Sequence, residues 1–106
     1  MQFKKNDLVE VEVEVPVFDS KGNVSSYQPI PAQYEIKDYQ TGPAGEKIIL
    51  ERRTPREMID NSIPNIIEII KGANGNVTND IGTFDDGVKH DVHTKITANI
   101  SDPSKN

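Results

Sequence analysis

The feature that most constrains this chain is a strict alternation of valine with polar residues between residues 8 and 18. Successive side chains of a β-strand point to opposite faces, so a period of two gives each face one residue type. The pattern predicts a half-buried antiparallel strand with a wet acidic face. Proline has no backbone N–H, so Pro16 places this end at a sheet edge or a bulge. The alternating residues are Val9, Val11, Val13, Val15 and Val17 against Glu10, Glu12, Glu14 and Pro16.

The other apolar residues also favour strands. Isoleucine and valine dominate, and leucine occurs only at Leu8 and Leu50. Branching at Cβ restricts χ1 and suits a pleated surface better than a helix. A glycine-containing turn at 19–23 leads from the first strand to a second expected strand at 24–39. Another at 41–45 leads to a third at 47–53.

A helix is expected after the third strand. Thr54 suits the N-cap, Pro55 the first helical position and Glu57 a capping box. Apolar residues then recur at helical spacing and form one stripe. Pro64 is expected to kink the helix. The stripe residues are Ile59, Ile63, Ile66, Ile67 and Ile70.

A competing interpretation makes residues 65–71 a strand. Asn74-Gly75 is a strong hairpin signal, and it would join this strand to another beginning at Val77. Periodicity alone does not decide between helix and strand for a short apolar run.

The last third resembles a β-hairpin. Residues 77–84 form its first arm, Asp85-Asp86-Gly87 its turn and residues 88–100 its second arm. An arm of about 13 residues exceeds the usual strand length, so it is expected to bend or carry a bulge. Its inward row is expected to be Val88, His90, Val92, Thr94, Ile96, Ala98 and Ile100, and its outward row Lys89, Asp91, His93, Lys95, Thr97 and Asn99.

These elements predict one α+β domain covering residues 1–106. An antiparallel sheet of about five strands, in the order β-β-β-α-β-β, packs on one kinked helix. An all-β sandwich or barrel is the alternative. The ends at 1–6 and 101–106 are polar and expected to fray. The sheet is expected to bury Val9, Val11, Val13, Val15, Ile36, Ile49, Val92 and Ile96.

Composition excludes several functional classes. The 106 residues contain no cysteine, so no disulfide framework or thiol nucleophile is present. A net charge of −5 argues against direct nucleic-acid binding, which needs a basic face. No apolar run is long enough to span a membrane, and MQFKKND lacks the apolar core of a secretory signal. Glycine motifs for nucleotides are absent. We therefore expect a cytoplasmic chain without membrane contact or cofactor.

A cluster of aspartates and histidines is the best candidate for chemistry. On one strand His90 and His93 point to opposite faces and do not chelate together without a bulge. The pattern therefore favours a solvated hairpin tip, and we expect no metal site. The cluster comprises Asp80, Asp85, Asp86, His90, Asp91 and His93.

Two charged features have structural explanations beside functional ones. Glu10, Glu12 and Glu14 create a negative field that suits a basic partner, or they face cations on a neighbouring strand. The arginines at 52, 53 and 56 flank the expected helix start, where they either hold an anion or pair with nearby glutamates.

We therefore expect a non-catalytic protein-interaction or assembly module, with a protein partner and homo-oligomerisation. The strand at 88–100 offers an unblocked edge for strand addition. Small acidic cysteine-free chains are also typical of accessory proteins of bacteriophages and mobile elements. The expected interaction residues are Glu10, Glu12, Glu14, Lys89, Asp91, His93 and Lys95.

Two alternatives stay open. One is a small enzyme or ligand-binding domain with a helix–sheet pocket near His90, lined by Tyr27, Tyr34, Tyr39 and Asp91. The other is an acidic inhibitor of a host DNA-binding enzyme that uses the glutamates of the first strand.

Overall fold

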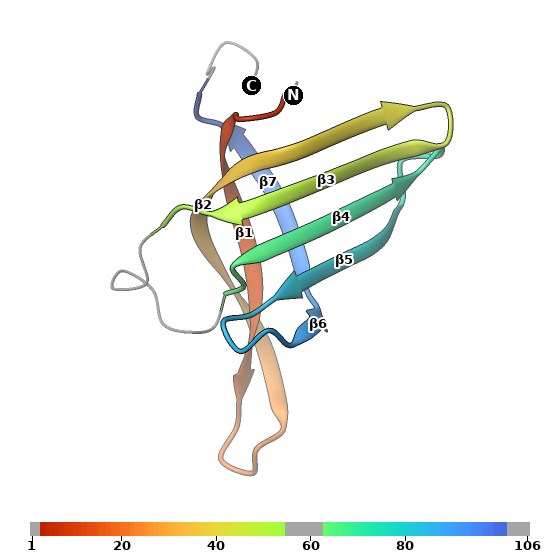
Figure 1. The fold of residues 1–106 in the computed structure, drawn as a ribbon. Coiled ribbons are helices and arrows are strands. Elements are labelled where there is room, and N and C mark those ends of the chain that lie inside the picture. Colours follow the sequence, from red (N-terminus) through yellow and green to blue (C-terminus); the bar gives the residue numbers. More distant parts are fainter. Residues whose placement is uncertain (1–2, 55–62, 102–106) are drawn as a thin grey trace.

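The computed structural model describes residues 3–54 and 63–101. They form one seven-stranded antiparallel sheet with the strand order β6-β5-β4-β3-β2-β1-β7 (Figure 1). The sheet curls into a half-barrel. The strands are β1 (Leu8–Phe18), β2 (Val24–Gly42), β3 (Gly45–Arg52), β4 (Ile66–Gly72), β5 (Val77–Thr83), β6 (Lys89–Asp91) and β7 (His93–Asn99).

The curl arises because one chain segment pairs with both edges of the sheet. β6 pairs with β5, and β7 pairs with β1. Only Val92 separates β6 from β7, and its N–H donates to the carbonyl of Asp80 at 2.9 Å. The Asp80 side chain then accepts from the backbone N–H of Thr94 at 2.7 Å. This corner, formed by Asp80, Val92 and Thr94, joins the two edges of the sheet.

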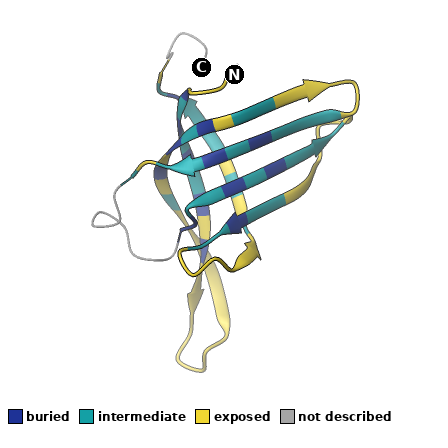
Figure 2. Ribbon diagram, viewed as in Figure 1, coloured by how far each residue is buried: buried dark blue, intermediate teal, exposed yellow. Residues whose placement is uncertain are grey.

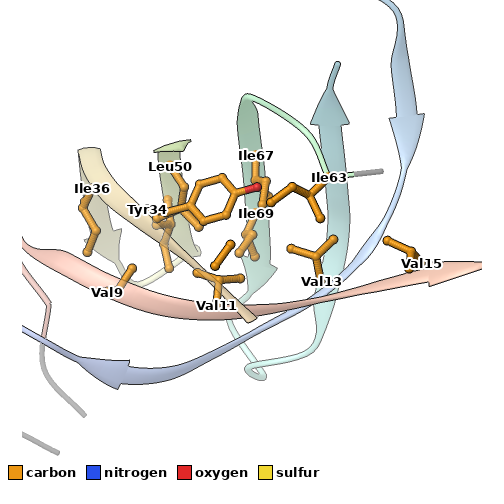
Figure 3. Close-up of a cluster of buried hydrophobic side chains, with 12 residues drawn as sticks. Val9, Val11, Val13, Val15, Tyr34, Ile36, Leu50, Ile63, Ile67 and Ile69 are labelled. Atoms are coloured by element: carbon orange, nitrogen blue, oxygen red, sulfur yellow. The ribbon is translucent and has the colours of Figure 1, made fainter. Parts of the chain in front are cut away.

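The alternation in the first strand is confirmed. Val9, Val11 and Val13 are at most 1% exposed and face the concave side of the sheet (Figure 3). The intervening glutamates lie on the convex side, half-buried or exposed. The core is completed by Ala32, Tyr34, Ile36, Ile48, Leu50, Ile63, Ile67 and Ile69.

Tyr34 is the largest polar side chain in this core. It is 0% exposed, and its hydroxyl donates to the carbonyl of Pro64 at 2.6 Å. Burial raises the pKa of the phenol, and the nearby Arg52 guanidinium acts in the opposite direction. The hydroxyl therefore stays protonated and fastens β2 to the segment that precedes β4.

The expected α+β fold with a kinked helix is wrong. The described residues contain no helix, and the isoleucine-rich segment forms β4 between β3 and β5. Ile67 and Ile69 are buried while their neighbours are half-buried, which is a period of two. The Gly72–Asn76 turn, with Gly75 at φ 83°, closes the β4–β5 hairpin. The apolar spacing of this segment fits either a helix or a strand, and hydrogen bonding to β3 and β5 on both sides makes it a strand.

The class given as the alternative, all-β, is the one observed. The expected cap residues Pro55 and Glu57, together with Arg56 and Ile59, lie outside the described residues. The part of the chain that is described has no helix with the length and apolarity to span a membrane.

Two bulges interrupt the pairing of the sheet. One lies in β2, where Ile36 pairs with Leu50 but Tyr39 pairs with Ile48. Within β3 the alternation is unbroken, and because Ile48 and Leu50 are buried, Ile49 lies half-buried on the convex face. A second shift in the β1–β7 pairing turns Asn99 inward, where it is 0% exposed. Its amide donates to the buried Asp7 carboxylate at 2.9 Å. The expectation that Ile49 is buried was wrong because β3 buries its neighbours Ile48 and Leu50 instead. Alternation placed Asn99 outside, and this was wrong because alternation counts residues and the bulge in β7 adds one.

Candidate interaction surface

The convex face of β1 brings together five of the seven expected interaction residues. Glu10, Glu12 and Glu14 follow one another along this face. The register places Lys95 of β7 opposite Glu12 and His93 opposite Glu14. Side chains directly opposite in antiparallel strands are about 5 Å apart at Cβ, so Lys95 offsets part of the negative charge of the three glutamates.

Lys89 and Asp91 do not lie on this convex face of β1 and β7. They belong to β6, where Lys89 pairs with Thr83 and Asp91 with Ile81. Asp91 nevertheless borders the same grooves as Glu14 and His93, because the chain turns from β6 to β7 at Val92.

The β1–β2 hairpin extends beyond the rest of the sheet as a two-stranded arm, residues 15–28 (Figures 1 and 2). Pairing with β7 ends at Glu14, and pairing with β3 begins only at Tyr34. The arm therefore has no third strand along either side. An isolated two-stranded ribbon of this kind gains little from its own contacts.

The arm carries an exposed apolar patch, which we call the arm patch: Pro16, Phe18, Val24 and Tyr27. Pro16 pairs with Tyr27, and Phe18 pairs with Val24. Phe18 is 61% exposed, Tyr27 55% and Val24 46%. Aromatic side chains bury about 150–250 Å² each in cores and interfaces, so this exposure leaves a large apolar area in water.

The β7-facing edge of the arm is blocked by Pro16. The N–H of Ile100 donates to the carbonyl of Leu8 at 2.8 Å, so even-numbered β1 residues turn their backbone towards the β7 side. Pro16 occupies such a position just beyond the end of β7 and offers no N–H to an added strand.

The opposite edge is blocked by Pro29 and Pro31. The N–H of Arg53 donates to the carbonyl of Gln33 at 2.7 Å, so odd-numbered residues in this part of β2 turn their backbone away from β1. Both prolines follow this direction, towards a side that β3 does not reach. Pro16 thus disfavours strand addition on one edge of the arm, and Pro29 and Pro31 disfavour it on the other edge where the arm joins the sheet, which favours contact with a partner through side chains.

A groove of about 750 Å³ runs between the arm and the β5–β6 hairpin. Phe18 and Tyr27 form one wall, and Phe84, His90 and Asp91 belong to the other side. The rings of Phe84 and His90 meet edge to face with centroids 5.5 Å apart. The groove thus combines aromatic surface with polar side chains at its border.

A second groove of about 620 Å³ continues from the first. It lies between β5 and β7, and both grooves include Glu14, Asp91, Val92 and His93. The ring of His93 also approaches Tyr27, with centroids 6.2 Å apart. The two grooves adjoin at these shared residues, and we call them together the trough.

The tyrosines expected to line a pocket near His90 separate in the structure. Tyr34 is a core residue, and the Tyr39 hydroxyl donates to Glu46 at 2.7 Å. Burial, together with that hydrogen bond, raises the pKa of Tyr39 to about 12. Only Tyr27 borders the groove that contains His90.

Asp80 is the half-buried carboxylate of the trough. It accepts from the Thr94 hydroxyl at 2.9 Å as well as from the Thr94 N–H. Burial raises the pKa of Asp80 above its ordinary value, and the hydrogen bonds from Thr94 partly oppose this. The side chain is committed to the corner of the sheet, so its role there is structural.

The aspartate and histidine cluster is spread along β5, the turn after it, β6 and the first residue of β7. Within residues 3–54 and 63–101, no three His, Cys, Asp or Glu side chains gather closely enough to hold a metal ion.

The described arginines pair with carboxylates. Arg53 contacts Glu35 at 3.0 Å, and Arg52 contacts Asp85 at 3.8 Å. Arg52 also donates to the carbonyl of Ile63 at 3.3 Å. These contacts favour the structural explanation of the arginines over an anion site.

Sequence reasoning named Tyr27 but overlooked Phe18 and Phe84 as residues of the trough. Phe18 continues the even-numbered face of β1 beyond Glu14 and Pro16, so its position on the convex side was readable from alternation. That Phe18 and Phe84 border the same groove depends on the curl of the sheet, which no local pattern encodes. Comparisons with protein-family models, curated proteins and solved structures find no match for this chain.

Proposed function

We propose that this chain is a non-catalytic protein-interaction module that docks a partner through the arm patch. The observation that carries the proposal is the exposure of Phe18 and Tyr27, 61% and 55%, on a hairpin that no other strand supports. Contiguous exposed apolar surface on a small domain typically marks an interaction site. Aromatic residues are also enriched among residues that dominate binding energy.

The chemistry of the surroundings supports a protein partner. Pro16 on one edge of the arm, and Pro29 and Pro31 at the base of the other edge, disfavour strand addition and favour side-chain docking as the mode of contact. The net charge of −5 disfavours direct contact with nucleic acid or an anionic membrane. A cytoplasmic location and an origin among bacteriophage or mobile-element accessory proteins stay predictions from composition.

Comparative capture tests the proposal. The wild-type chain, the double variant Phe18→Ser/Tyr27→Ser and the control Val88→Ser are immobilised and exposed to lysate of the source cells. Val88 is 46% exposed but borders neither groove of the trough, so it controls for loss of a surface apolar group. Mass spectrometry should find proteins that the wild type and the control retain and the double variant loses.

Equal capture by all three chains would contradict the proposal. All substituted residues are exposed, so we expect melting temperatures within about 2 °C of wild type, because surface substitutions usually change stability by less than about 0.5 kcal/mol. Sedimentation at several concentrations then tests a second copy as the partner. Association that depends on Phe18 and Tyr27 would assign homo-oligomerisation to the arm patch.

A further inference from the structure

We propose that the trough binds an extended peptide segment of a partner protein in which apolar and basic residues lie two positions apart. This inference rests on the proposed function and names the chemistry of the partner. It is argued from the shape of the trough, the charge along it and the blocked edges of the arm.

The shape suits an extended segment. The two grooves adjoin at Glu14, Asp91, Val92 and His93 and together follow β1, β5, β6 and β7. Small-molecule sites bury about 70–90% of their ligand. One wall here consists of Phe18 and Tyr27, more than half exposed, so the trough opens to solvent on that side.

The charge suits a basic segment. The trough contains four carboxylates, those of Glu12, Glu14, Asp80 and Asp91, against one lysine, Lys95. The Asp80 carboxylate already accepts a hydrogen bond from the Thr94 hydroxyl, and Lys95 lies opposite Glu12. Glu14 and Asp91 are exposed and border both grooves, so they are the carboxylates best placed to meet a cation.

The aromatic rings add a second reason for a basic segment. Phe18, Tyr27 and Phe84 border the groove that also contains Glu14 and Asp91. A lysine or arginine side chain packs its methylene groups on such rings and places its charge over a ring face or near a carboxylate. An acidic or purely polar segment would gain neither contact.

The blocked edges determine how the segment lies. Pro16 removes the donor that an added strand would need from β1. An extended segment therefore docks by alternate side chains, which point to the same side every second residue. We expect apolar side chains on the aromatic wall and basic side chains towards Glu14 and Asp91.

Selection from a random library of displayed 12-residue peptides tests the inference. The wild-type chain is the target, and recovered sequences are expected to carry lysine or arginine two residues from an aliphatic or aromatic residue. One recovered peptide is synthesised with a fluorophore, and its affinity is measured by fluorescence anisotropy. Replacing its basic residues with norleucine should weaken binding.

Charge variants locate the contact. Glu14→Gln/Asp91→Asn should weaken binding by about threefold to tenfold, the usual range for two partly exposed ion pairs, and less at high salt. Glu51→Gln/Glu68→Gln is the matched control, because it removes two carboxylates from the convex face of β3 and β4, outside both grooves. The control should bind like wild type.

Three results would overturn the inference: no recovered peptide, recovered peptides without basic residues, or equal weakening by the two double variants. Peptides that lack basic residues yet lose binding in Phe18→Ser/Tyr27→Ser would refute the charge argument and leave the proposed function standing. Capture from lysate that ignores the arm patch would refute the proposed function itself.

Discussion

Gly82 provides a sharp test of how the half-barrel closes. A Cβ atom at this position would lie 2.7 Å from Cγ and 2.8 Å from Cβ of Pro64, and 3.2 Å from Cγ1 of Val92. Carbon atoms in ordinary contact are about 3.5–4.0 Å apart, so Pro64 would have to move by at least about 0.8 Å. Pro64 is fully buried, and its carbonyl accepts the Tyr34 hydroxyl. The substitution Gly82→Ala therefore strains a site that holds two parts of the core together.

The magnitude follows from two opposing effects. Overpacking a well-packed core costs about 1–3 kcal/mol. Replacing a strand glycine with alanine gains about 0.5–1 kcal/mol through backbone entropy. We expect a net loss of about 1–2 kcal/mol, which lowers the melting temperature by about 4–12 °C in a domain of this size.

Gly42→Ala is the matched control. Gly42 ends β2, its φ is not positive and nothing lies within 4 Å of the added Cβ, so only the entropic gain should operate. Circular dichroism melts and urea titrations of both variants provide the comparison. If Gly82→Ala proves as stable as Gly42→Ala, Pro64 does not pack closely enough against Gly82 of β5 for an added methyl group to strain the core.

Two further predictions concern buried polar groups. Tyr34→Phe leaves the carbonyl of Pro64 without its 2.6 Å donor and should cost about 1–3 kcal/mol in urea unfolding, and an unchanged midpoint would refute this role. Asp80→Asn removes a carboxylate whose pKa is raised by burial while keeping an acceptor for Thr94. Because the raised pKa means that the folded state binds the proton more tightly, wild-type stability relative to Asp80→Asn should fall as pH rises from 4 to 7, as measured by urea unfolding at each pH. A difference that does not change with pH, or that grows in favour of the wild type, would contradict the argument.

Local sequence determined the first strand and its orientation. The alternation of Val9 to Val15 with glutamates allows only one arrangement that buries the valines and hydrates the carboxylates, and the structure has it. The prolines of the arm were also informative, because a residue without an N–H is restricted to positions that need no donor. The convex glutamates at 10, 12 and 14 could therefore be placed before any tertiary structure was known.

The isoleucine segment shows where local information ended. Ile63, Ile66, Ile67 and Ile70 fit a helical stripe, and Ile67 and Ile69 fit a strand. Both patterns exist in the same residues, so the outcome depended on partners elsewhere in the chain. β3 and β5 supplied hydrogen bonds on both sides of β4. The prediction of a helix was wrong because the spacing of apolar residues contains no information about these partner strands.

By itself, then, the sequence decided which face of the first strand buries its valines, where prolines forbid pairing, and that cysteine chemistry plays no part. Tertiary structure alone decided the curl, the two bulges and the placement of Phe18 and Phe84 along one groove. The physical reason is the range of the interactions. Alternation and turn chemistry act over a few residues, whereas the pairing of β1 with β7 joins residues far apart in the sequence, such as Val9 and Asn99, and so depends on how everything between them folds.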